Sequence, residues 1–339
     1  MPGAWVQIAV LCASVAAPEG TTTSSVSTGR RALAVGATVV PGLLLHGSGH
    51  FVLGDADTAG SLLALEGIGL GTIVAGLAAI AVTGASRKTV APLTGITIAG
   101  AGLFTMTFAA DLYGVLGIPV ARAQPLAPIE TSLGVAYVRD RLFDYGAFAT
   151  WSLDLRFDDL RLSPSAWVAL DDDNARLRGE LAYRLAGDSR AAFLDLVTAL
   201  THHHYGSDGF AITTGEIAVA SRIGTDWLLP ALKGSFVEGS FGVGLEGHRF
   251  FDRATHPVSL LVGGFGFGFY LPRGEVAVYY DHRHDGFAAG LKMGGLGSGV
   301  AGHLGARGEW FFGDLGLRVQ AETGSAHVMS AALVYRGAP

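Results

Sequence analysis

From residue 129 onward, apolar and polar residues alternate one by one along much of the chain. In residues 151–157, Trp, Leu, Leu and Phe occupy the odd positions, whereas Ser, Asp and Arg occupy the even positions. The same order recurs in residues 177–185 and 315–322. Because successive side chains of a β-strand point to opposite faces, this period of two predicts strands with one apolar and one polar face.

A soluble β-sandwich alternates in the same way, so three further features are needed to choose between it and a membrane barrel. The polar face carries Arg, Glu and Asp on strand after strand, which suits a water-filled lumen. The connections are short, as in an up-and-down meander. Aromatic residues fall near strand ends, as in an interfacial girdle: Tyr137, Trp151, Phe157, Tyr183, Tyr270, Trp310, Phe312 and Tyr335.

These features predict a closed antiparallel up-and-down β-barrel over residues 128–337. This part of the chain resembles bacterial outer-membrane β-barrel proteins, and the resemblance implies that its apolar face contacts lipid. We expect about 12 strands, since single-chain bacterial barrels have an even number, and ten or fourteen remain as alternatives. The expected strands are residues 130–139, 146–158, 177–186, 191–203, 209–222, 232–249, 257–271, 275–282, 286–293, 299–312, 315–323 and 327–336.

If the apolar face contacts lipid, the ionisable residues of the strands face the lumen. The expected lumen-facing residues are Asp154, Arg156, Arg178, Glu180, Arg184, His303, Arg307, Glu309, Arg318 and Glu322.

Glycines form a second pattern within the predicted strands. The chain has 50 glycines, where average usage gives about 24. Glycines alternate with large apolar residues in two of these strands, so we expect a glycine stripe in the lumen. The stripe consists of Gly242, Gly244, Gly264, Gly266 and Gly268. Such a stripe leaves room for a ligand or an inserted plug. The alternative is that the glycines permit strong strand curvature.

Residues 30–120 form a different, nearly uncharged segment. Residues 58–84 and 89–110 are each apolar and long enough to cross a bilayer as a helix. Arg87 and Lys88 lie in the short turn between them, as expected of a cytoplasmic loop. The predicted fold class is therefore membrane α+β, in which an apolar helical hairpin precedes the barrel. A buried hairpin of a soluble protein is the alternative.

A short motif precedes the hairpin. Residues 40–55 read VPGLLLHGSGHFVLGD, and Thr58-Ala59-Gly60 follows. This motif resembles the TM2-type family of small bacterial membrane segments, in which a Pro-Gly pair, a Gly-aromatic stretch and a further Gly precede two transmembrane helices. The resemblance implies membrane embedding.

The N-terminal residues read as targeting sequence. Residues 1–17 are apolar and end in small side chains, as in a secretory signal, and residues 18–29 are rich in Ser and Thr, as in a flexible linker. The single cysteine, Cys12, excludes an intramolecular disulfide and a cysteine-cluster metal site. We expect export to the bacterial outer membrane, with the inner membrane, reached through the hairpin, as the alternative.

Histidines and carboxylates gather in alternate connections of the predicted meander. Alternate connections share one barrel end, so these residues would meet at one mouth. They are the ligand types of a Zn²⁺-like divalent metal site, and the alternative is solvated polar turns. The candidate metal ligands are His203, His204, His256, His282, His284 and Asp285.

Four ionisable residues lie in or beside the apolar helices: His46, His50, Glu66 and Asp111. Charged groups within a membrane are costly and often functional, so metal or proton handling is one hypothesis for them. The other hypothesis is capping and interfacial anchoring.

Composition and motifs narrow the function. The net charge is −6 and no long basic run occurs, so a nucleic-acid partner is not expected. The sequence contains neither Gly-x-Ser-x-Gly nor His-Glu-x-x-His. We expect a non-enzymatic pore for small solutes or a structural envelope protein in contact with the lipid bilayer. The alternatives are a barrel-embedded hydrolase or metal-binding protein that uses the His/Asp-rich end, and an envelope-spanning scaffold.

Overall fold

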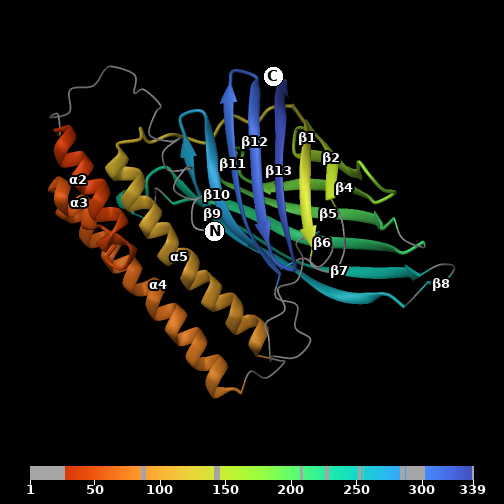
Figure 1. The fold of residues 1–339 in the computed structure, drawn as a ribbon, viewed down its shortest axis with the longest axis horizontal. Helices are drawn as coiled ribbons and strands as arrows, with labels where there is room; N and C mark the ends of the chain where they lie inside the picture. Colours follow the sequence, from red (N-terminus) through yellow and green to blue (C-terminus); the bar gives the residue numbers. More distant parts are fainter. Residues whose placement is uncertain are drawn as a thin grey trace. The chain divides into compact units, whose positions relative to one another are not determined.

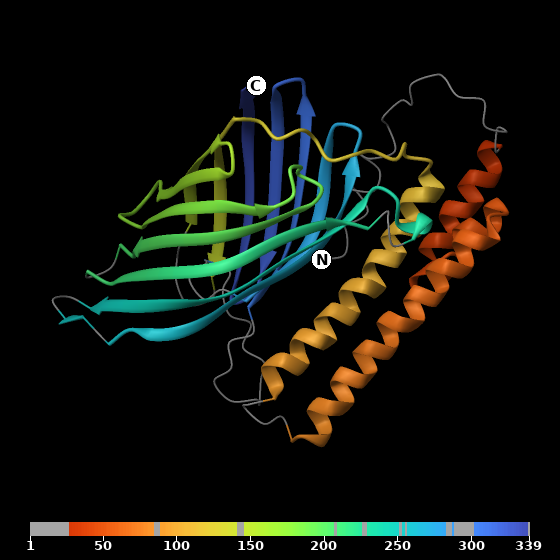
Figure 2. The same cartoon turned by 180° about the vertical axis from the view of Figure 1, so that it is seen from behind.

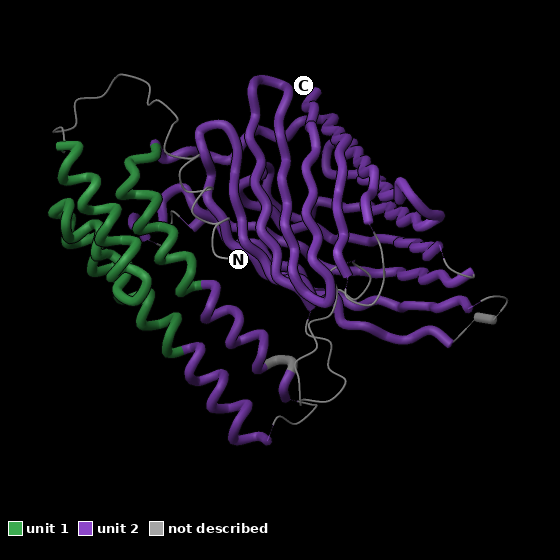
Figure 3. The backbone as a smooth tube through the Cα atoms, viewed as in Figure 1, with its two compact units in different colours: residues 1–71, 103–118 green, residues 72–102, 119–339 purple. Residues whose placement is uncertain are grey.

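The computed structural model describes residues 27–84, 89–140, 146–206, 209–225, 229–250, 253–254, 256–282, 287 and 302–337. Its contacts divide the chain into two compact units, residues 1–71 with 103–118 and residues 72–102 with 119–339 (Figure 3). The predicted signal-like segment 1–17 lies outside the described residues, as does most of the predicted linker 18–29. The last two linker residues are helical.

The predicted helical hairpin is confirmed, and shorter helices precede it. In chain order the helices are α2 (Thr28–Val39), the 3-10 helix η1 (Pro41–Leu43), α3 (Ser48–Leu53), α4 (Ala56–Val82) and α5 (Val90–Leu116). Gly54 ends α3 in the left-handed conformation, at φ +86°. Asp55 then caps α4, because its Oδ1 accepts a hydrogen bond from Thr58 N at 3.1 Å.

Both long helices carry apolar side chains over most of their surface. By length and composition alone, Ala56–Val82 and Leu93–Leu116 are each able to cross a membrane. Gly76 of α4 lies directly against the Thr97 side chain of α5, so the two backbones approach closely at this point. That residues 30–120 are embedded in a membrane remains a prediction.

The C-terminal part of the chain consists of antiparallel strands. They are β1 (Ile129–Asp140), β2 (Gly146–Phe157), β3 (Leu160–Ala169), β4 (Ala175–Ala186), β5 (Phe193–His204), β6 (Ala211–Gly224), β7 (Ser235–Phe250), β8 (Arg253–Ala254), β9 (Val258–Leu271), β10 (Gly274–Asp281), β11 (His303–Phe312), β12 (Leu315–Thr323) and β13 (Ala326–Gly337). All pairings among them are antiparallel.

The sheet closes on itself. The strand order is β6-β5-β4-β3-β2-β1-β13-β12-β11-β10-β9-β7-β8, and β6 also pairs with β7. The first and last strands pair along their whole lengths, from Ile129↔Gly337 to Asp140↔Ala326, and Figures 1 and 2 show them side by side. The two-residue β8 pairs with the end of β7. The long strands thus form the predicted closed 12-strand barrel.

The strand prediction needs one correction, and one expected strand falls mostly outside the described residues. The prediction missed β3, whose sequence contains Pro164. Proline donates no ladder hydrogen bond, and the β2–β3 register skips from Ser152↔Ser165 to Leu155↔Leu162 at this point. Conversely, a strand was expected at residues 286–293. Phe287 lies there in a turn, and the rest of that range lies outside the described residues.

The two barrel ends differ in their connections. At one end lie the turns 158–159, 272–273 and 313–314, the connections 187–192 and 225–234, the start of β1 and the end of β13. We call this the short-turn end. At the other end lie the connections 141–145, 170–174, 205–210, 251–257, 282–302 and 324–325, and we call it the long-loop end.

The wall has an apolar outer surface. On β13, Met329, Leu333 and Tyr335 are 67%, 70% and 47% exposed, whereas the alternate residues Val328 and Val334 are buried. The same division holds around the wall, for example with Leu177, Leu181 and Tyr183 on β4. An apolar surface of this extent on a closed barrel is what a lipid-facing wall requires.

Candidate functional site

The inward face of the barrel is identified by contacts between strands that are not neighbours. Arg222 of β6 forms a bidentate ion pair with Glu275 of β10, at 2.9 and 3.0 Å. Arg307 of β11 reaches Glu238 of β7 at 2.7 Å. Such side chains meet only inside the barrel, so they fix which alternate residues of each strand face the lumen.

By this criterion, the structure places all ten predicted lumen residues on the inward face. Most have a partner there: Arg178 contacts Glu216 and Glu180, Arg184 contacts Asp195 at 2.5 Å, and Ser163 donates to Asp154. Burying charges is costly unless they are paired, and the lumen meets that condition with Arg–carboxylate pairs.

Four neighbouring strands, β1, β13, β12 and β11, carry a closed ring of ion pairs near the short-turn end. Arg318 lies 2.6 Å from both Glu309 and Glu130, through its Nε and Nη2 atoms respectively. Arg336 completes the ring, at 2.7 Å from Glu130 and 3.2 Å from Glu309. The four residues come from β12, β11, β1 and β13, which are neighbours in the sheet.

A second group of ion pairs lies on β6, β7, β10 and β11. Arg222 bonds both Glu275 and Glu238, and Glu238 also accepts from Arg307. The guanidinium of Arg222 lies over the ring of Phe236, with its Cζ 4.1 Å from the ring centre. Arg307 also lies 4.0 Å from Glu275, so each carboxylate in this group faces two cations, which offsets the cost of its burial.

Arg190 joins the two groups. It lies in the connection between β4 and β5, and its guanidinium is 2.9 Å from Glu309, 3.5 Å from Glu275 and 3.7 Å from Glu130. We call the whole set the ionic network: Glu130, Arg190, Arg222, Glu238, Glu275, Arg307, Glu309, Arg318 and Arg336. None of its side chains is more than 26% exposed, so the network is largely buried within the barrel.

Sequence reasoning found only Arg307, Glu309 and Arg318 of this network. It missed six residues, of which five lie on strands and face the lumen. Assigning inward and outward positions along every strand, and not only along the clearest ones, would have found these five. Arg190 lies in a connection, where no phase applies, and nothing in the sequence marks it. The missed residues are Glu130, Arg190, Arg222, Glu238, Glu275 and Arg336.

An apolar cluster lies beside the network. Phe236, Tyr270 and Ala277 are buried there. Ala121 and Ala123, from the segment that precedes β1, pack against this cluster, as does Ala191 from the Arg190 connection. Chain segments outside the strands thus help to fill the barrel near its short-turn end.

Aromatic residues fill the lumen toward the long-loop end. Phe287, from the connection between β10 and β11, lies 4.8 Å from the rings of Phe148 and His203 and 5.4 Å from that of Trp167, measured between ring centres. We call these four residues the aromatic cap. Phe148 is fully buried and belongs to a larger apolar cluster with Phe287.

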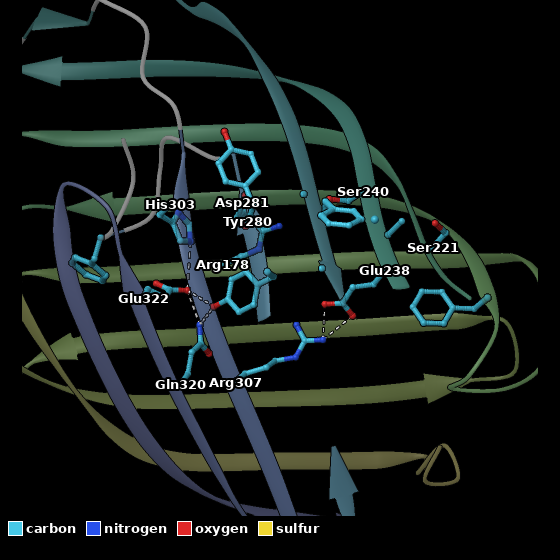
Figure 4. Close-up of a pocket in the computed structure, with 18 of the residues that line it drawn as sticks. Arg178, Ser221, Glu238, Ser240, Tyr280, Asp281, His303, Arg307, Gln320 and Glu322 are labelled. Carbon is cyan, nitrogen blue, oxygen red and sulfur yellow. Dashed lines mark hydrogen bonds and ion pairs between the residues drawn. The ribbon is translucent and has the colours of Figure 1, made fainter. Parts of the chain in front are cut away.

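A cavity of about 400 Å³ lies in the lumen between the cap and the network. Members of both sets line it, together with Arg176, Arg178, Ser221 and Ser240. Figure 4 shows Arg307 turned toward Glu238, and Glu322 beside Gln320 and His303. Glu322 accepts from Tyr279 at 2.7 Å and from Gln320 at 2.6 Å. Charged, polar and aromatic side chains all line the cavity, and its volume is within the size range of small-molecule sites.

The predicted glycine stripe lies on the inward face. Gly264 and Gly266 line the cavity. A Cβ at Gly266 would lie 3.0 Å from both Glu238 Oε1 and Tyr279 Cβ, and one at Gly268 would collide with Phe236. The space above these two glycines is therefore filled by neighbouring side chains rather than left for a ligand.

The predicted metal ligands lie in connections at the long-loop end or on the adjoining strand ends. His203 Nε2 lies 2.9 Å from Asn174 Oδ1, and the His203 ring stacks on Tyr205. His256 is exposed, and His282 Nδ1 lies 2.7 Å from Tyr280 Oη. His204 lies on the outward phase of β5, while His284 and Asp285 lie outside the described residues. Among described residues, no three His, Cys, Asp or Glu side chains group as metal ligands. The metal site stays a prediction.

The ionisable residues of the helical unit bind its backbone. Asp111 accepts hydrogen bonds from the N–H groups of Gly47, Gly49 and His50 at 2.9 to 3.3 Å, and its Oδ1 lies 2.6 Å from His50 Nδ1. Glu66 accepts from His46 N at 2.8 Å. All four ionisable residues are buried. The two carboxylates thus tether the turn around residues 46–50 to α4 and α5.

Comparison with known proteins finds distant structural similarity only. The chain matches no protein-family model and no curated protein sequence. Three solved structures to which it is similar are outer membrane protein Omp33 of Acinetobacter baumannii, outer membrane phospholipase A of Escherichia coli, and the translocator domain of autotransporter NalP from Neisseria meningitidis.

The similarity is structural and distant. Identities are 9%, 9% and 11%, with TM-scores of 0.34, 0.34 and 0.35. The matches cover 63%, 64% and 65% of this chain and 100%, 99% and 91% of the other chains. The closed barrel itself rests on the strand pairing of this chain, which is that of a bacterial outer-membrane β-barrel.

Proposed function

We propose that this chain is a non-enzymatic outer-membrane pore for small polar solutes, and that it rests in a closed state. The observation that carries this proposal is the cavity of about 400 Å³ between the aromatic cap and the ionic network, which charged and polar side chains line together with aromatic ones. A cavity of this kind, inside a wall whose outer face is apolar, is a compartment for a small solute on a path across the membrane.

A histidine–hydroxyl pair on the barrel gives no support to the hydrolase alternative. On the outer surface, His202 Nδ1 lies 2.9 Å from Thr213 Oγ1. Activating a hydroxyl for nucleophilic attack requires a base that is itself oriented by a third group. Thr213 is the one hydrogen-bond partner of His202 among the described residues, so this pair lacks the orienting group.

A second candidate is a purely structural envelope protein. The observation that favours it is that the network and the cap both fill the lumen, as they would in a barrel that never conducts. The two candidates differ in one property. A resting pore conducts when its closures are weakened, whereas a structural barrel does not.

The deciding experiment is single-channel recording in planar bilayers. The double variant Arg190→Ala with Phe287→Ala weakens both closures and leaves the strands intact. The pore proposal predicts discrete conductance steps from this variant and sparse ones from the wild type. Asp188→Ala is a matched control, because Asp188 is an exposed acid in the same connection as Arg190. A double variant that inserts but never conducts supports the structural candidate instead.

We also place the helical pair in a membrane, on the support of the length and composition of α4 and α5. Density-gradient separation of the membranes of a host cell tests the location. The protein is expected with outer-membrane markers. Recovery with inner-membrane markers would favour insertion through the helices and contradict the proposed location.

A further inference from the structure

The connection between β4 and β5 places a charged side chain across the lumen. This connection, residues 187–192, belongs to the short-turn end, and its Arg190 is only 16% exposed. Its three carboxylate partners are on β1, β10 and β11. None of these strands neighbours β4 or β5 in the sheet. The side chain therefore crosses the interior to reach the opposite wall.

Arg190 is held differently from the other cations of the ionic network. Arg222, Arg307, Arg318 and Arg336 are on strands, where displacing them would disrupt ladder hydrogen bonds. The Arg190 connection is held by local bonds: Ala192 N donates to Ser189 Oγ at 3.2 Å, and Arg184 Nη1 donates to Gly187 O at 3.2 Å. Arg190 can therefore leave the lumen without disturbing the wall.

The three carboxylates keep partners when Arg190 leaves. Glu130 and Glu309 retain Arg318 and Arg336, and Glu275 retains Arg222. Removing a cation from a buried ion pair is usually prohibitive, because it leaves an uncompensated charge. Here each of the three carboxylates still has at least one arginine partner, which limits that cost.

Arg190 also lies between the two groups of ion pairs that make up the ionic network. It is the residue that joins the ring of Glu130, Glu309, Arg318 and Arg336 to the group around Arg222. Ala191 next to it packs on Phe236 and Tyr270. Withdrawal of the connection would thus remove both a charged bridge and an apolar contact from the lumen near the short-turn end.

We infer that the connection of residues 187–192 is the gate of the short-turn end, with Arg190 as the latch on the ionic network. The inference rests on the proposed pore function. It assigns the resting closure at this end to one movable connection rather than to the wall. The aromatic cap lies toward the other end.

The test compares four proteins in planar bilayers: the wild type and the variants Arg190→Ala, Phe287→Ala and the double variant. Phe287→Ala and the double variant both lack the Phe287 side chain of the cap. The open probability of the double variant is expected to exceed that of Phe287→Ala by about tenfold or more, since the charge-assisted contact between Arg190 and Glu309 is lost. Arg190→Gln, which keeps most of the side-chain length, repeats the comparison should Arg190→Ala assemble poorly. Asp188→Ala is expected to behave as the wild type.

The outcomes distinguish failure of the gate from failure of the pore. If Phe287→Ala alone opens as often as the double variant, the gate is refuted and the pore stands. If the double variant never conducts although it is folded and inserted, the pore proposal fails and the gate fails with it. Opening that requires the Arg190 substitution supports both.

Discussion

Replacing Asp111 by alanine tests the role of the buried carboxylate in the helical unit. The substitution removes the acceptor of three backbone N–H groups, those of Gly47, Gly49 and His50, and the partner of the His50 ring. Each hydrogen bond to a charged group contributes about 1.5–3 kcal/mol, but such bonds are not additive. Breaking a buried charged contact by removing one partner costs about 3–5 kcal/mol, and we expect a loss in this range.

Hydrogen exchange measured by mass spectrometry reports this loss locally. The three amides lie in the peptide that covers residues 44–54. This peptide contains no barrel residue, so its exchange rate can be read separately from that of the strands. A loss of about 3–5 kcal/mol corresponds to exchange faster by roughly a hundredfold or more, since about 1.4 kcal/mol is a factor of ten. Asp57→Ala is the matched control, because Asp57 is an exposed acid in the first turn of α4. Exchange within about threefold of the wild type in Asp111→Ala would refute the tether.

Two further predictions concern the barrel. Leu333→Arg places a charge on the exposed outer face of β13 and is expected to cost about 2–4 kcal/mol of folding free energy in lipid bilayers, measured by urea titration; an unchanged midpoint would contradict a lipid-facing wall. Arg222→Ala leaves Glu275 with only Arg190 and the more distant Arg307, and is expected to lower stability by about 3–5 kcal/mol in the same assay; a loss below about 1 kcal/mol would mean that the ionic network does not stabilise the barrel.

The barrel could be predicted from the sequence because apolar and polar residues alternate along most of its strands. Lipid outside and polar groups inside require alternate residues to differ, so the period of two reports the strands directly. The rule failed at β3, where Pro164 interrupts the ladder. The 12 strands of the barrel include the missed β3, and the strand expected at residues 286–293 falls mostly outside the described residues.

The site was less predictable because its contacts are distant in sequence. Arg318 and Glu130 are 188 positions apart, and Arg190 and Glu309 are 119 apart. Alternation says which face a strand residue occupies but not which partner it meets. Residues in connections, such as Arg190 and Phe287, have no phase at all, so their insertion into the lumen had no signal in the sequence.

The same limit applies to the helical unit. His46, His50, Glu66 and Asp111 were recognisable as ionisable groups in apolar surroundings. That Asp111 binds the backbone of Gly47 and Gly49 depends on the fold of the turn, in which Gly47 has φ +87°. These contacts resemble capping, in that carboxylates accept hydrogen bonds from backbone N–H groups; metal or proton handling stays a prediction.

The central claim is that alternate residues of the wall face lipid and lumen. Spin labels on single cysteines introduced at residues 329–335 of β13, with Cys12 replaced by serine, measure it in reconstituted bilayers. The account predicts that accessibility to molecular oxygen, which partitions into lipid, is high at odd-numbered positions and low at even-numbered ones. A uniform profile, or one that repeats every three to four residues, would contradict it.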